Sequence, residues 1–273
     1  MKKACLCALL ALGSIGSAAT ITSGTASFML GDTVSSFDTS PTANFTFGGV
    51  DHLFEWGWWS RGSGDAQEFA LSVPIIVAAG NQMTLTWSGL PGGLTSVSGT
   101  LVLTLVENSA NLATLDAVFT LTNNNQVSET INLFNMADID LQPTAGDDQV
   151  SGGLSGIIVT HASNSRAARF SGLGASAFLV RAFSSTTDVA AVLSDAAVTN
   201  FDNSGIPFGP GDMTSGFQWT STIGAGQSAV FASRLEIALD GNLPQDPGNG
   251  VPEPSTYGLI GAGLAGIAFL RRR

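Results

Sequence analysis

LVLTL at residues 101–105 and AVFTL at residues 117–121 share one pattern, in which an apolar side chain occupies every second position. Successive side chains of a β-strand point to opposite faces, so each run can bury one face as a strand. The remainder of residues 20–250 is rich in Gly, Thr, Ser and Asn and has hardly any helical periodicity. Many short strands without alternating helices predict an all-β fold, an antiparallel β-sandwich or jelly roll.

Two turn-rich segments interrupt this alternation. Each separates a pair of alternating runs: residues 123–126 (NNNQ) lie between 117–121 and 128–141, and residues 224–227 (GAGQ) lie between 217–223 and 228–239. Asn and Gly tolerate the left-handed backbone that tight turns need, so we expect an antiparallel hairpin at each segment. In the second hairpin Leu235 should face the core, whereas Arg234 and Glu236 should face water. One helix is expected, at residues 188–198.

The composition narrows the functional class. Of 273 residues, 10 are Lys or Arg and 21 are Asp or Glu, which gives a formal net charge of −11. A nucleic-acid interface needs clustered cationic side chains, so a nucleic-acid partner is excluded. Residues 20–250 contain no Lys, five Arg and 20 acidic residues, a net charge of −15. The hydrophobic content of 44% is high enough for a folded core.

The N-terminal residues have the organisation of a secretory signal. Residues 1–3 are positively charged, residues 4–15 are apolar, and residues 17–19 (SAA) are small enough for cleavage. We therefore expect a signal peptide at residues 1–19 and a mature chain that begins near Thr20. Both cysteines lie in the segment that is removed, so the exported protein should have no disulfide and no thiolate site.

The C-terminal residues have three parts. The first is the motif Val251, Pro252, Glu253 and Pro254, which proline keeps extended because its ring fixes φ. Residues 257–270 follow without a charge, and as a helix they would be roughly 21 Å long, against the ~30 Å hydrocarbon core of a bilayer. The arginines at 271–273 should remain in the cytoplasm. These parts predict a short transmembrane helix with the body of the protein outside the cytoplasm.

This order of parts resembles the PEP-CTERM sorting signal of exported bacterial proteins. Its membrane part comprises Tyr257, Gly258, Leu259, Ile260, Ala262, Gly266, Phe269, Leu270, Arg271, Arg272 and Arg273. The resemblance implies that an exosortase, an integral membrane protease, recognises the chain and cuts near Pro-Glu-Pro. It also implies a Gram-negative bacterium that makes exopolysaccharide and grows in biofilms. Residues 137–141, 208–212 and 217–219 are similar to stretches in the bodies of PEP-CTERM proteins, a similarity that carries no activity.

Four parts of the chain follow from these signals: a signal peptide at 1–19, a β-sandwich body at 20–240, a linker rich in Gly, Pro and Asn at 241–250, and the sorting signal at 251–273. Signal peptidase and an exosortase are the expected partners. The precursor should be anchored in the inner membrane with its body facing the periplasm. The mature protein should reach the cell surface or the extracellular space.

Four carboxylates form a candidate metal site. Asp138 and Asp140 point to the same side of a predicted strand, and Asp147 and Asp148 follow a turn of sequence PTAG. Carboxylate oxygens are ligands that Ca²⁺ prefers, and no Lys is available to balance their charge. The spacing is not that of an EF-hand loop. Two interpretations therefore stay open, a Ca²⁺ site, with no other cofactor expected, and a solvated acidic turn.

A row of aromatic side chains is the second candidate site. His52, Phe54, Trp56 and Trp58 alternate on one face of a predicted strand. If they were exposed, the rings of Trp56 and Trp58 could stack on the faces of sugars. Rings of this kind more often fill the core of a sandwich, where their burial contributes a few kcal/mol each.

No catalytic motif is apparent. His52 and His161 are the only imidazoles, and neither lies in a metal-ligand spacing or beside a nucleophile motif. We therefore predict no catalytic residue and expect an exported, non-enzymatic protein with a structural or interaction role in an exopolysaccharide matrix. The alternatives are a carbohydrate-binding module or adhesin, with or without Ca²⁺, and a secreted hydrolase.

Overall fold

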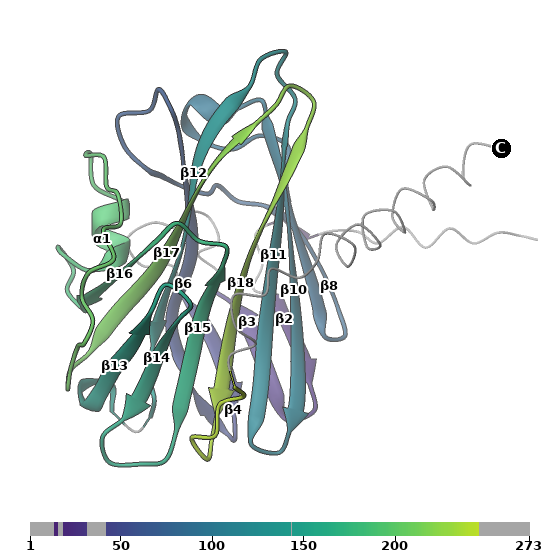
Figure 1. Cartoon of the computed structure of the whole chain (residues 1–273). Coiled ribbons are helices and arrows are strands. Elements are labelled where there is room, and N and C mark those ends of the chain that lie inside the picture. The colour runs from purple at the N-terminus through teal and green to yellow at the C-terminus, as the bar shows by residue number, and fades with distance from the viewer. Residues whose placement is uncertain (1–13, 16–18, 32–41, 143, 246–273) are drawn as a thin grey trace, which may run out of the picture. The chain divides into compact units, whose positions relative to one another are not determined.

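Three antiparallel sheets make up the computed structural model of this protein, which describes residues 14–15, 19–31, 42–142 and 144–245 (Figure 1). The nine-stranded sheet has the order β1 (Ser14–Ile15), β8 (Ile75–Ala79), β9 (Gln82–Trp87), β10 (Val97–Ser109), β11 (Leu112–Asn123), β18 (Ser228–Ala238), β15 (Ala167–Leu173), β14 (Gly156–His161) and β13 (Asp148–Gly153). The five-stranded sheet has the order β16 (Ala177–Ala182), β17 (Met213–Ile223), β12 (Glu129–Ile139), β6 (Leu53–Gly62) and β7 (Phe69–Ala70). The four-stranded sheet has the order β2 (Ala19–Ser23), β3 (Ala26–Leu30), β4 (Ala43–Phe47) and β5 (Val50–Asp51).

Helical structure is confined to three short segments in the described residues: α1 (Val189–Leu193) and the 3₁₀ turns η1 (Gly92–Leu94) and η2 (Ala145–Asp147). The prediction of an all-β antiparallel sandwich is confirmed. The runs quoted at the outset lie in β10 and β11, the central strands of the nine-stranded sheet. Leu101 pairs with Phe119, and both are buried.

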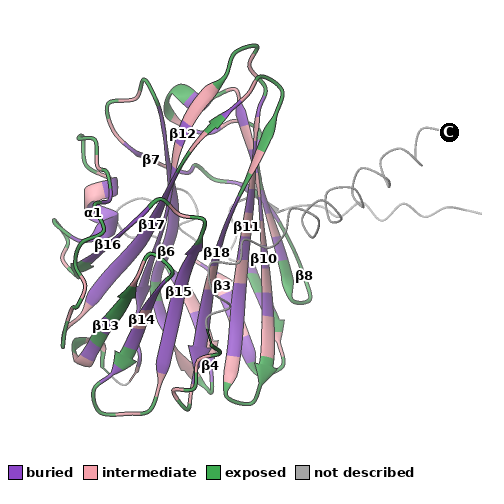
Figure 2. Ribbon diagram, in the orientation of Figure 1, coloured by how far each residue is buried: buried purple, intermediate pink, exposed green. Residues whose placement is uncertain are grey.

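The core lies between the nine-stranded sheet and the other two sheets (Figure 2). Trp58 on β6 contacts Phe119 on β11, with 5.3 Å between ring centroids, and stacks on Trp219 of β17 at 5.8 Å. Trp56 extends the same core toward the four-stranded sheet, where it contacts Phe28 on β3 at 5.7 Å. Aromatic side chains from all three sheets therefore hold the layers together.

Both predicted hairpins are wrong. β11 belongs to the nine-stranded sheet, but β12, which follows the Asn-rich turn, pairs with β6 and β17 in the five-stranded sheet. In the same way β17 belongs to the five-stranded sheet, whereas β18 pairs with β11 and β15. Each turn-rich segment thus carries the chain from one layer of the sandwich to the other.

Asn123 joins the connection between β11 and β12 to the connection between β17 and β18. Its buried side-chain amide donates to the carbonyl oxygens of Val127 at 2.8 Å and Ile223 at 2.9 Å. Its backbone N–H donates to the carbonyl of Gln227 at 3.0 Å, and its own carbonyl accepts from Gly226 N–H at 2.9 Å. Asn123 therefore provides hydrogen-bond partners for backbone groups in both crossovers. In a hairpin within one sheet, the two strands would pair such backbone groups with each other.

Glu236 does not face water as predicted. It is buried on β18, where its carboxylate accepts from Arg169 Nε on β15 at 2.6 Å. Arg234 does remain partly exposed, and it pairs with Asp116 on β11 at 2.7 Å. The predicted inward side of β18 is correct, since Leu235 is buried.

The helix α1 is shorter than predicted. Asp188 caps its N-terminus by accepting from Ala191 N–H at 2.7 Å. The helix ends before Ser194, whose hydroxyl accepts from the indole of Trp59 at 3.1 Å. Thr199 N–H then donates to the carboxylate of Glu68, so the chain beyond α1 is held against the five-stranded sheet instead of continuing as a helix.

The two ends of the chain lie largely outside the described residues. Within the predicted signal peptide, β1 pairs with Ile75–Ile76 of β8, and Ala19 begins β2. Contacts divide the chain into units at Met1–Leu243 and Pro244–Arg273. The sorting motif and the membrane part at residues 251–273 belong to the undescribed residues. Among the described residues, no helix has the length and apolar character that crossing a membrane requires.

Candidate functional site

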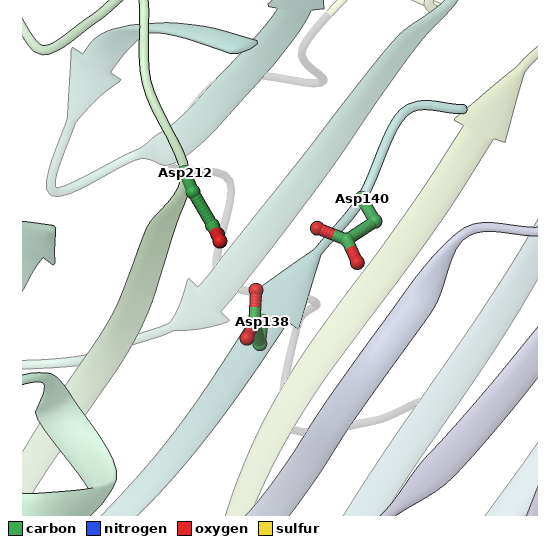
Figure 3. A group of neighbouring side chains, drawn as sticks. All are labelled: Asp138, Asp140 and Asp212. Carbon is green, nitrogen blue, oxygen red and sulfur yellow. The ribbon is translucent and has the colours of Figure 1, made fainter. Parts of the chain in front are cut away.

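Three aspartates converge where β12 ends and β17 begins. Asp138 lies near the end of β12, Asp140 follows it by two residues, and Asp212 immediately precedes β17. One carboxylate oxygen of each residue lies within 4.8 Å of an oxygen of each of the others. Figure 3 shows the three carboxylates directed toward a common space. We call these three residues the acidic site.

The loop that carries Asp212 is fixed against β13. Val150 N–H donates to the carbonyl of Phe208 at 2.8 Å, and Gly211 N–H donates to the carbonyl of Asp148 at 3.0 Å. Gly209 has a φ of 98°, and a Cβ at this position would lie 2.2 Å from the Asp148 carbonyl oxygen. Only glycine allows both this conformation and this approach, so it helps to hold Asp212 in place.

Asp138 is the most deeply buried member of the acidic site. Its relative exposure is 1%, and its Oδ1 atom has no hydrogen-bond partner among the described residues. Burial, and next the charges of Asp140 and Asp212, raise the pKa of Asp138 well above its usual value. Burial raises the pKa of Asp140 to about 6 and also raises the pKa of Asp212. When all three carboxyl groups of the acidic site are ionised, their negative charges are therefore poorly compensated.

The structure changes the predicted set of carboxylates. Asp147 is not part of the acidic site, and it accepts from the hydroxyl of Thr144 at 3.0 Å. Asp148 is fully buried, accepts from Leu141 N–H at 3.3 Å, and leaves its Oδ1 without a partner among the described residues. Burial raises the pKa of Asp148 to about 7, with smaller contributions from the charges of Asp140 and Asp212. Asp148 thus lies close enough to influence the acidic site without joining it.

Sequence reasoning missed Asp212, which lies more than 70 positions after Asp138 in the chain. No local spacing connects the two residues. The available signal was that residues 137–141 and 208–212 both resemble stretches found in other PEP-CTERM bodies. The structure brings these two segments together at the acidic site.

In the absence of a metal ion, stability should decrease as the pH rises. In the native state the pKa of Asp140 is raised to about 6 and that of Asp148 to about 7, whereas in the unfolded state both carboxyl groups have the usual pKa of 3.8. At pH values between 3.8 and these raised values, the native state therefore binds more protons than the unfolded state. The free energy of unfolding then falls from about pH 4 to about pH 7. Thermal melts in chelator from pH 5 to pH 8 should show this fall, and Asp138→Asn should reduce it. A melting temperature that rises over this range would contradict the assignment.

The acidic site fits a hard divalent cation. Ca²⁺ binds oxygen ligands at roughly 2.4 Å, so two oxygens on opposite sides of one ion lie about 4.8 Å apart. The carboxylate oxygens of Asp138, Asp140 and Asp212 lie within 4.8 Å of one another, so they can surround one such ion. Ca²⁺ takes about six to eight oxygen ligands, and three carboxylates supply three to six of them. Further ligands would come from water or from hydroxyl groups of a bound molecule.

The aromatic row does not form the predicted sugar platform. Trp56 and Trp58 are 1% and 0% exposed, so neither ring is available to a sugar, and the alternative of core residues is correct. Of the four residues in the row, Phe54 alone is exposed. Sequence alternation could not reveal this difference, because β6 is buried on both of its faces along most of its length.

Neither histidine is a member of the acidic site, although the backbone carbonyl of His52 accepts from Asp140 N–H at 3.1 Å. His52 is buried, its Nε2 lies 3.1 Å from the carbonyl oxygen of Phe47, and burial lowers its pKa to about 4. His161 Nδ1 accepts from Ser163 N–H at 3.1 Å. Both imidazoles therefore have structural partners in the backbone.

Solved structures share this fold at low sequence identity. A candidate aldose 1-epimerase from Escherichia coli K12 matches with a TM-score of 0.55 and 9% identity, over 82% of this chain and 99% of its own. A bacterial glucoamylase in complex with acarbose matches with a TM-score of 0.51 and 9% identity, over 86% of this chain and 35% of the glucoamylase. This chain therefore spans about a third of the glucoamylase. The prediction of a non-enzymatic body is overturned, because the same sandwich occurs in proteins with the names of enzymes.

The C-terminal residues match a family model. The family model described as the PEP-CTERM protein-sorting motif matches residues 250–273, which include the VPEP motif and the arginine cluster. No curated protein matches this chain. The protein therefore carries a PEP-CTERM sorting motif, and this identifies it as an exported protein that an exosortase sorts.

Proposed function

We propose that this exported protein binds Ca²⁺ at Asp138, Asp140 and Asp212 and acts at the cell surface through the bound ion. The observation that carries the proposal is the carboxylate of Asp138, which is buried and leaves its Oδ1 without a partner among the described residues. One of its two oxygens lies within 4.8 Å of oxygens of two further carboxylates, toward which the side chain is directed (Figure 3). A buried charge without a partner is costly, and a cation would remove that cost.

The positive charges of the body are engaged elsewhere. Residues 20–250 contain no Lys, and each of the five Arg side chains bonds to another group. The pairs are Arg61 with Glu68, Arg166 with the carbonyl of Gln142, Arg169 with Glu236, Arg181 with the carbonyl of Thr187, and Arg234 with Asp116. Three of these arginines pair with carboxylates outside the acidic site, and the bonds of Arg166 and Arg181 are to neutral carbonyls. A proton or a metal ion can neutralise the acidic site. Ca²⁺ fits better than Mg²⁺, which demands strict octahedral geometry and retains several waters.

Calcium should raise the melting temperature of the purified exported protein. At a free Ca²⁺ concentration about 100 times the dissociation constant, the native state gains about 2.7 kcal/mol, which corresponds to an increase of about 5–10 °C for a body of this size. Differential scanning calorimetry in Ca²⁺ and in chelator measures this shift, and isothermal titration calorimetry measures the affinity. Asp138→Asn should abolish both signals.

Asp195→Asn is the matched control, because Asp195 is exposed and its hydrogen bond within the described part of the chain is local, accepted from Ala197 N–H at 2.7 Å. This variant should retain the full shift in melting temperature. The proposal fails if 10 mM Ca²⁺ leaves the melting temperature of the unmodified protein unchanged, or if Asp138→Asn shows the same shift.

We also infer the setting in which the ion acts. After removal of residues 1–19 by signal peptidase, the precursor is held in the inner membrane by residues 257–270 with its body in the periplasm. Processing near Pro252–Pro254 then delivers the body to the cell surface or the extracellular matrix, where it interacts with exopolysaccharide. The PEP-CTERM motif supports the route, and the fold shared with a glucoamylase and a candidate aldose epimerase supports a role that involves carbohydrate.

A further inference from the structure

Two exposed phenyl rings belong to residues whose backbones neighbour the acidic site. Phe54 is 48% exposed and Phe183 is 40% exposed, although most other Phe side chains are buried. Their ring centroids are 6.1 Å apart, and their planes meet at 80°. The two rings therefore form an edge-to-face pair that remains open to solvent.

The backbone places this pair next to the carboxylates. Phe183 N–H donates to the carbonyl oxygen of Asp212 at 3.0 Å. Phe54 immediately precedes Glu55, which lies opposite Asp138 in the register of β6 and β12. Phe183 is thus hydrogen-bonded to a residue of the acidic site, and Phe54 is next to a residue that pairs with another.

The strand order shows how the rings meet. Phe183 follows β16 and Phe54 lies on β6, and the two strands between them are β17 and β12. These are the strands whose ends carry Asp212 and Asp138. Neighbouring strands are about 4.8 Å apart, so the three spacings from β16 to β6 amount to about 14 Å. The two side chains can therefore be in contact only if both extend over the ends of β17 and β12. The contact between the rings therefore spans the two strands whose ends carry the carboxylates.

We propose that the Phe54–Phe183 pair and the acidic site together bind a neutral saccharide. The inference rests on the proposed Ca²⁺ site and names its ligand. A sugar ring has an apolar C–H face and an edge of hydroxyl groups. The C–H face would lie on the phenyl rings, and two adjacent hydroxyl groups would complete the coordination of the ion.

The ligand count and the charge both favour a neutral sugar. Three carboxylates leave positions open on an ion that takes about six to eight oxygen ligands. Three ionised carboxylates with one Ca²⁺ still carry a net negative charge, and residues 20–250, which include these carboxylates, have a formal net charge of −15. A uronic acid would be repelled by this field, whereas a neutral sugar with adjacent hydroxyl groups would not.

An array of neutral and uronate-containing oligosaccharides, probed in Ca²⁺ and in chelator, tests the inference. We expect neutral oligosaccharides to be retained in Ca²⁺ only. Phe54→Ala and Phe183→Ala should each weaken retention at least tenfold, while the Ca²⁺ affinity measured by calorimetry stays unchanged. Asp138→Asn should abolish both. Val230→Ala is the control, because Val230 is 49% exposed on β18 in the nine-stranded sheet and should change neither signal.

The results separate this inference from the proposed function. If Ca²⁺ binds and no oligosaccharide is retained, the saccharide inference is overturned and the metal site stands. The same conclusion follows if uronates alone are retained, or if the two Phe variants retain neutral sugars as the unmodified protein does. If Ca²⁺ does not bind, the proposed function itself is overturned. Thermal melts verify that each variant is folded, and Phe183→Ser provides a second truncation of the pair.

Discussion

Replacing Trp58 with alanine is expected to lower the free energy of unfolding by about 3–5 kcal/mol, the usual cost of removing a large buried aromatic side chain. The Trp58 ring is fully buried and contacts Phe119 and Trp219, which come from the two opposing sheets. Its loss would leave a cavity between the layers. Urea denaturation at constant m-value measures the change.

Trp58→Phe is the graded control for this prediction. Phenylalanine keeps most of the apolar contact and removes an indole N–H that has no hydrogen-bond partner among the described residues. We expect it to cost less than half as much as alanine. A Trp58→Ala variant of unchanged stability that loses saccharide binding would show that the ring serves a ligand and would contradict its assignment to the core.

Breaking the buried ion pair of Arg61 and Glu68 is expected to have a similar effect. Both side chains are almost fully buried. Arg61 also donates to the carbonyl of Thr199 at 2.8 Å and to the side chain of Asn200 at 2.6 Å. Arg61→Met should cost about 3–5 kcal/mol, because it leaves the Glu68 carboxylate buried without its counter-ion. Burial already raises the pKa of Glu68, so this loss should grow as the pH increases.

Two further variants identify the cause of that loss. The double replacement Arg61→Met with Glu68→Met should be more stable than Arg61→Met alone, since no charge remains buried. Arg234→Met breaks a pair with Asp116 that is partly exposed, and it should cost less than about 1 kcal/mol. Equal losses for Arg61→Met and Arg234→Met in chemical denaturation would show that burial does not control the strength of these pairs.

Local patterns in the chain were sufficient to predict many of the strands and the export of the protein. The alternation at 101–105 and 117–121 is a property of successive side chains in an extended backbone, so it identifies strands without knowledge of their partners. The sorting motif is equally local, since Val251–Pro254, an apolar segment and three arginines are contiguous. Asp138 and Asp140 could be paired for the same reason, because they are two positions apart on one strand.

The arrangement of the layers and of the acidic site depended on contacts between distant residues. A turn of Asn and Gly indicates that the chain reverses, but the pairing of β12 and β18 with distant strands decides that each reversal changes sheet, and the hydrogen bonds of Asn123 join the two crossovers. The alternation on β6 predicts one inward face, yet Trp58 is buried against Phe119 of the opposing sheet, Trp59 on the other face is buried and bonds to Ser194, and Phe54 is exposed. Asp212 joins Asp138 only because β17 pairs with β12. Periodicity encodes which side of a strand is apolar, whereas the identity of its neighbours is set by the packing of the whole chain.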